Sequence, residues 1–239
     1  MVSISEIRKR IVNEIADCLS DIGFTSGKEQ TFYTVSEGTI HVVKICFLDR
    51  RHAAYFGSNT ASFSLELGVF YTFVPFSRDI AGYDEDSEVF PKHYECHIRG
   101  CLLRDIPQIA PSLDYAWDEE TQAAIKNAQR WWSSFPKHRA WLSFLWRKNK
   151  HSDNRDDIWW VDSSGSNLDE VLTSATRVIR KRSKAWLDKF SDLECAYRYL
   201  RCRSGKNSWQ GGPFNLGKKG CPLRKELMKH ISTKLNGEI

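Results

Sequence analysis

Hydrophobic positions at the start of the chain repeat with the period of a helix. Ser3 and Glu6 have capping-box spacing, in which each side chain bonds the backbone amide of the other residue. Apolar residues then recur every three or four positions up to Gly23, a residue type that commonly ends helices. The pattern predicts a helix over residues 4–22 whose buried face contains Ile7, Ile11, Val12, Ile15, Ala16, Leu19 and Ile22.

Strand-like patterns follow this helix. Residues 31–35 and 39–48 are rich in β-branched and aromatic side chains, and the turn residues 36–38 separate them, which predicts a hairpin. Residues 61–73 alternate between apolar and polar side chains, which predicts an antiparallel strand with one face in the core and the other in solvent. Further strands are predicted at 93–103 and 158–161.

Helical periodicity returns in the second half of the chain. The pattern predicts helices at 118–132, 168–190, 192–203 and 221–235, the second of them beginning at Asn167. Strands early and helices late predict an α+β fold, with an antiparallel sheet of four to five strands packed by helices. We expect one domain over 1–239, made of a helix-plus-sheet body (1–166) and a basic helical C-terminal part (167–239).

Charge is distributed unevenly along the chain. The total is +5, from 35 Lys and Arg against 30 Asp and Glu. Residues 1–172 hold 19 basic and 25 acidic residues, a net of −6, while residues 173–239 hold 16 and 5, a net of +11. Residues 77–87 read as an exposed acidic loop. The division predicts either an acidic partner for the C-terminal part or docking of that part on the acidic body.

The sequence indicates a reduced, cytoplasmic protein. The seven Cys are odd in number, and no pair has the two-residue spacing of a zinc ribbon or a redox motif. Charges appear within residues 1–10, before any apolar stretch of signal-peptide length. The longest uncharged apolar-rich run, 67–76, is about half as long as a membrane-spanning helix needs. We therefore expect no membrane association.

A basic cluster in the predicted helix 168–190 is the first candidate binding site. Lys and Arg at this density can neutralise the charge of an acidic protein or of phosphates, and a neighbouring Trp can stack on a base. Charge runs on helices are also commonly solvated faces, so a plain surface stays open as an interpretation. The candidate residues are Arg177, Arg180, Lys181, Arg182, Lys184 and Trp186, with Lys218 and Lys219 further along.

The segment 93–97 is a candidate metal site. On a strand, the period of two would place His93, Glu95 and His97 on one face. Two imidazoles and a carboxylate can bind a divalent metal. The same residues would also fit a solvated strand face, and Arg99 in the same row would repel a cation.

Signatures of common enzymes and cofactor sites are missing from the sequence. The chain has no P-loop, no dinucleotide-binding glycine pattern, no Gly-x-Ser-x-Gly and no His-Glu-x-x-His. We therefore predict no cofactor and no catalytic residues, and favour a non-enzymatic role.

Short motifs spread over residues 10–236 carry a family resemblance. They are Gly23-Phe24, Thr31-Phe32-Tyr33, FSLELGVF at 63–70, CHIRG at 96–100, WWVD at 159–162, KFSDL at 189–193 and CPLRKEL at 221–227. In this order they resemble the bacterial proteins grouped as domain-of-unknown-function family 4304. The resemblance implies no established catalytic residues, and it implies a context of toxins, immunity proteins or phage defence.

These observations lead to three functional hypotheses. The first is a non-enzymatic protein-binding factor, toxin-neutralising or associated with phage defence, which acts through charged patches. In it, helix 177–189 meets an acidic protein surface, or the loop 79–88 meets a basic one. The second is a nucleic-acid-binding component of a defence assembly that uses helix 177–189. The third and weakest is a metal-dependent enzyme centred on His93, Glu95 and His97.

Overall fold

A computed structural model describes residues 3–50, 53, 59–74, 90–102, 158–162, 164–202 and 222–237. Several predicted features lie outside these described residues. They are the acidic loop 77–87 with the partner-binding segment 79–88, the helix 118–132, and the basic residues Lys218 and Lys219.

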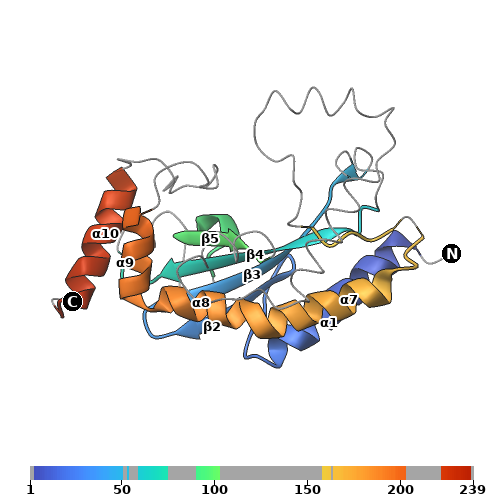
Figure 1. Ribbon diagram of the computed structural model, residues 1–239, viewed down its shortest axis with the longest axis horizontal. Coiled ribbons are helices and arrows are strands. Elements are labelled where there is room, and N and C mark those ends of the chain that lie inside the picture. Colours follow the sequence, from blue (N-terminus) through green and yellow to red (C-terminus); the bar gives the residue numbers. More distant parts are fainter. Residues whose placement is uncertain are drawn as a thin grey trace, which may run out of the picture. The chain divides into compact units, whose positions relative to one another are not determined.

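Five antiparallel strands form one sheet, in the order β1-β2-β3-β4-β5 (Figure 1). The predicted hairpin is confirmed: β2 and β3 pair from Thr31↔Lys44 to Ser36↔Thr39. Its tight turn contains Gly38, whose φ of +74° favours glycine. The strand bounds are Thr25–Ser26 for β1, Thr31–Ser36 for β2, Thr39–Phe47 for β3, Phe63–Tyr71 for β4 and Ile98–Cys101 for β5.

Helices precede and follow the strands, which confirms the predicted α+β class. The first helix begins as its sequence predicts. The Ser3 amide donates to Glu6 Oε2 at 2.7 Å, and the Glu6 amide donates to Ser3 Oγ at 3.2 Å, which completes the capping box. The α-helices are α1 (Ile4–Ser20), α7 (Leu168–Val178), α8 (Lys184–Ser191), α9 (Leu193–Cys202) and α10 (Pro222–Leu235).

The chain divides into two compact units, each built from three segments. The first comprises residues 1–22, 45–65 and 101–182, and the second comprises 23–44, 66–100 and 183–239. Within the first unit α1 packs against α7, and the buried side of α1 includes Ile7, Ile11 and Ile15. Within the second unit α9 packs against both α8 and α10.

Strand β4 differs from its prediction, because both of its faces are buried. Glu66 is the only residue of the strand with intermediate exposure, and most of its side chain is still covered; Ser64 on the expected solvent face is buried. The cover over Gly68 is close: a Cβ built on that residue would lie 2.5 Å from Cys96 Sγ. Alternation therefore predicted the strand correctly but could not show that a later segment packs over its polar face.

The predicted strand 93–103 is wrong at its beginning and too long. Residues His93–Glu95 form a 3-10 turn, in which the Cys96 amide donates to the His93 carbonyl at 3.1 Å. Strand hydrogen bonding starts only where the His97 amide donates to the Val69 carbonyl at 2.9 Å. The strand predicted at 158–161 is also shorter than expected: it consists of a single β-bridge between Trp159 and Phe63.

Candidate functional site

The helix that begins with α7 carries a basic surface. Its buried residues recur every three or four positions, so the residues between them face solvent. Arg177, Arg180 and Lys181 are exposed, at the i, i+3 and i+4 spacing that places side chains on one side of a helix. We call these three residues the basic face. Lys184, in the first turn of α8, is exposed as well.

Arg182 and Trp186, predicted to lie on this binding surface, are instead buried. Between α7 and α8 the helix widens into a π-turn over Ile179–Ser183, and Arg182 is only 8% exposed there. A π-turn accommodates an extra residue, and here both Arg182 and Ser183 are on the buried side. Trp186 is 5% exposed and packs edge-on against Phe190, with 4.8 Å between the ring centroids. In this conformation Trp186 cannot stack on a nucleic-acid base.

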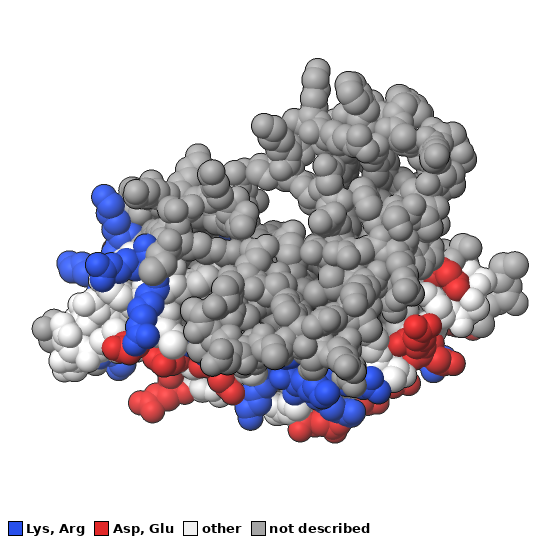
Figure 2. All heavy atoms as spheres, viewed as in Figure 1, with Lys and Arg blue, Asp and Glu red and all other residues white. Residues whose placement is uncertain are grey.

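Acidic side chains lie beside the basic face. Arg180 donates to Asp21 at 3.0 Å, and this hydrogen bond raises the pKa of the Arg180 guanidinium. A second ion pair joins Arg10 of α1 to Asp169 of α7 at 2.5 Å. Figure 2 shows Lys and Arg side chains gathered over this helix with Asp and Glu side chains beside them. The exposed surface of α1 and α7 therefore alternates in sign over short distances.

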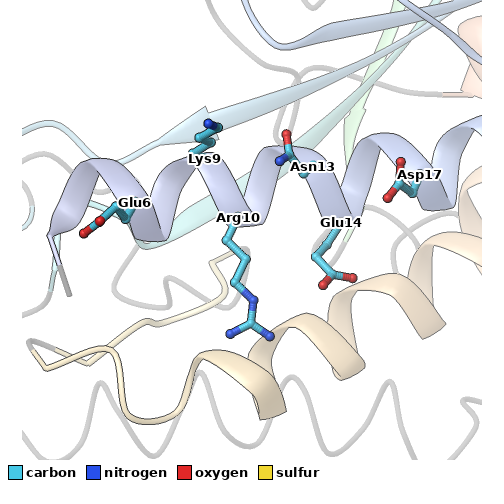
Figure 3. A pocket seen from close by; sticks show the side chains of 6 residues that line it. All are labelled: Glu6, Lys9, Arg10, Asn13, Glu14 and Asp17. Atoms are coloured by element: carbon cyan, nitrogen blue, oxygen red, sulfur yellow. The ribbon is translucent and has the colours of Figure 1, made fainter.

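A shallow hollow of about 280 Å³ lies along the exposed side of α1. Figure 3 shows Arg10 and Glu14 extending from α1 toward α7, while Lys9 and Asn13 extend the other way. Basic and acidic side chains both line the hollow, so it offers charge complementarity to a partner. It is lined by Glu6, Lys9, Arg10, Asn13, Glu14 and Asp17.

The three residues predicted to bind a metal make three separate contacts. His93 Nδ1 pairs with Glu66 Oε2 at 2.7 Å, and Glu95 accepts from the Lys92 amide at 2.6 Å. His97 Nδ1 accepts from the Tyr71 amide at 2.9 Å. Within the described residues, no group of three or more His, Cys, Asp or Glu side chains could hold a metal ion. The solvated strand face, the other interpretation of this segment, does not apply to the two imidazoles, which are both 4% exposed.

The structure instead forms a buried carboxylate–imidazole pair. The Glu66 and His93 side chains are only 15% and 5% exposed, and His93 Nε2 is buried without a hydrogen-bond partner among the described residues. Burial lowers the pKa of the Arg99 guanidinium, and the nearby charge of the Glu66 carboxylate opposes this shift. A carboxylate on Nδ1 fixes the tautomer and orientation of an imidazole, as in many catalytic and metal sites.

Sequence reasoning missed this pair for an identifiable reason. Alternation placed Glu66 on the polar side of β4 and suggested that it faced solvent. The 3-10 turn then brings His93 onto that side, 27 positions later in the chain. The available signal was the combination of a lone carboxylate in an apolar strand with a nearby His-rich segment, which does not specify a contact.

Two further histidines in the second unit are held in dry surroundings. His41 of β3 lies 2.6 Å from Ser191 Oγ at the end of α8, and burial lowers the pKa of its imidazole to about 4, although the charge of Asp188 opposes the shift. Burial alone lowers the pKa of His97 to about 3. Tyr71, which donates its hydroxyl to the Phe190 carbonyl at 2.7 Å, connects β4 to the end of α8. These contacts hold the sheet and helix together, because their polar atoms satisfy one another inside the core.

Known proteins give no further assignment. The chain matches no protein-family model, no curated protein and no solved structure. The resemblance to domain-of-unknown-function family 4304 therefore stays a prediction. No helix in the described ranges is long and apolar enough to cross a membrane.

Proposed function

We propose that this chain is a non-enzymatic binding protein that docks a protein partner on the surface formed by α1 and α7. The observation that supports the proposal is the alternation of charge on that surface. Arg177 and Lys181 are exposed, and the acidic residues Asp169, Asp17 and Glu14 are exposed on the same pair of helices.

This pattern suits a folded protein better than a polyanion. A partner with carboxylates opposite the basic face and with basic groups opposite the acidic residues gains attraction at every position. A uniformly negative partner would be repelled by the acidic residues. Charge complementarity of this kind mainly increases the association rate and selects the partner. Toxin neutralisation and phage defence, the roles that the family resemblance implies, are the finer form of this proposal.

A pull-down with matched variants tests the proposal. The tagged wild-type chain, R177Q/K181Q and R201Q/K225Q/K229Q are incubated with nuclease-treated lysate of the native host, and retained proteins are quantified. All substituted residues are exposed, so circular dichroism should show wild-type folding. We expect wild type and R201Q/K225Q/K229Q to retain the same protein in near-stoichiometric amount, and R177Q/K181Q to retain at least tenfold less. An empty eluate, or equal retention by all three, would contradict the proposal.

A further inference from the structure

Helices α1 and α7 lie side by side and run in the same direction (Figure 1). Three contacts between them join partners that are 159, 158 and 159 residues apart in the sequence. Because this separation is constant, each residue of α1 lies level with the residue of α7 about 159 positions later. The contacts are Arg10 with Asp169, the Cys18 thiol with the Thr176 carbonyl, and Asp21, the residue after α1, with Arg180.

Charges at the same level of this helix pair have opposite signs. Where α7 begins, α1 is basic and α7 is acidic, and toward the end of the pair the signs are exchanged. The exposed Glu6 lies before the level at which α7 begins. The surface therefore consists of four charged patches whose signs alternate along and across the helices. Their exposed residues are Lys9 and Arg10 beside Asp169 and Glu170, and Glu14, Asp17 and Asp21 beside Arg177, Arg180 and Lys181.

This arrangement of four patches is complementary to itself. A two-fold axis parallel to the helices turns a second copy over and leaves every residue at its own level, so that α1 of each copy faces α7 of the other. The three acidic residues of α1 then face three basic residues, and its two basic residues face two acidic ones. Asp17 and Arg177 of the second copy differ in level by about 1.5 Å. A two-fold axis across the helices fits less well, because it places the two basic residues of α1 opposite the three acidic ones.

The two ion pairs between α1 and α7 leave room for a second contact. The side chains of Arg10 and Asp169 are 51% and 79% exposed, and those of Arg180 and Asp21 are 56% and 62% exposed. In the two-copy arrangement each of these charges has one opposite charge in its own chain and another in the second copy. Isolated surface ion pairs contribute little to stability, whereas networks of several charges contribute more.

We propose that the partner bound by the α1–α7 surface is a second copy of this chain, related by a two-fold axis parallel to the two helices. This inference rests on the docking function proposed above and names its partner. The contacts are made by exposed charges, which salt screens, so the association should weaken at least tenfold between about 50 and about 500 mM KCl.

Sedimentation equilibrium of the purified full chain tests the inference through charge reversal. D17K/D21K makes the acidic end of α1 basic, and R177E/R180E makes the basic end of α7 acidic. Wild type should dimerise at 50 mM KCl, and each variant alone should stay monomeric, because like charges then face each other. All substituted side chains are exposed, so circular dichroism should show wild-type folding.

Two further samples test the orientation of the second copy. A mixture of D17K/D21K and R177E/R180E, with one of them fluorescently labelled, should form a heterodimer. The substitutions change the net charge of +5 to +9 and +1, so the two variants are not drawn together by opposite net charge. D17K/D21K/R177E/R180E restores the alternation with exchanged signs and should dimerise like wild type. R201Q/K225Q/K229Q, substituted on α9 and α10, is the matched control and should also dimerise.

A wild-type chain that stays monomeric at high micromolar concentration in 50 mM KCl would overturn the inference. Dimers of either reversed variant alone, or a mixture without heterodimer, would overturn it as well. The lysate pull-down separates this inference from the docking function, because the protein it retains should be the untagged host copy of this chain. A monomeric chain that retains a different protein through Arg177 and Lys181 overturns only the identity of the partner, whereas a monomeric chain that retains nothing contradicts both proposals.

Discussion

Acidification should destabilise this protein through two buried imidazoles, His41 and His97. Each is less than 5% exposed, and burial lowers their pKa values from 6.5 to about 4 and about 3. His97 Nδ1 accepts a hydrogen bond from the Tyr71 amide, which only an unprotonated nitrogen can do. Both imidazoles are therefore neutral in the folded chain at pH values where they would be protonated in the unfolded chain.

The sign and size of the effect follow from linkage. As pH falls below 6.5, the unfolded chain gains protons that the folded chain does not accept, so the free energy of unfolding decreases. The stabilisation is complete well above pH 6.5, and it is lost progressively until pH reaches the folded pKa values. Between pH 7.5 and 5 each imidazole should account for about 2 kcal/mol, and the two together for about 4 kcal/mol. That is a large share of a typical stability of about 5–15 kcal/mol.

Urea denaturation at pH 7.5, 6.5, 5.5 and 5, followed by tryptophan fluorescence, measures this loss. H41Q places an amide near the position of Nε2, and H97N places an amide oxygen near the position of Nδ1, so each variant keeps a polar group without the titration. Each single variant should remove about half of the pH-dependent loss, and H41Q/H97N should remove about 4 kcal/mol of it. If the double variant loses as much stability as wild type between pH 7.5 and 5, the imidazoles are not held neutral and the reasoning is wrong.

Substitutions at Gly68, Ser3 and Glu66 test the contacts described above by urea denaturation at pH 7.5. Gly68→Ala should destabilise the fold by about 1–3 kcal/mol, because its Cβ would lie 2.5 Å from Cys96 Sγ and 2.8 Å from Cys96 Cβ. Cys96→Ala in the same chain removes the nearer contact and should recover part of the loss, and no recovery would mean that the Sγ contact is not the cause. Ser3→Ala should cost about 1 kcal/mol by removing the cap of α1, and an unchanged midpoint would show that the cap adds nothing. Glu66→Ala should cost about 1–3 kcal/mol, since it leaves a buried His93 nitrogen without its partner. Glu66→Gln, which keeps an acceptor, should cost less, and equal losses would argue against that role for the carboxylate.

Local features of this protein could be predicted from the sequence because their causes are local. The cap and apolar period of α1 involve residues within one or two helical turns of each other, and the structure reproduces them. The β2–β3 hairpin needs only two β-rich runs and a turn with Gly38. The charge of +11 over 173–239 is likewise a property of the chain alone.

Tertiary packing decided which polar residues are exposed. The apolar–polar period of one segment does not show whether another segment of the chain packs over its polar side. The alternation that predicts β4 fits a polar side that faces solvent, and it fits equally well a polar side covered by the 3-10 turn, which buries Glu66 against His93. Closeness in the sequence grouped Arg182 and Trp186 with the exposed basic residues, but Arg182 is buried in the π-turn and Trp186 is buried against Phe190. His93 and His97 are buried partners of Glu66 and Tyr71, because contacts between distant segments position their nitrogens. Burial depends on the whole fold, and burial determines the chemistry of a titratable side chain.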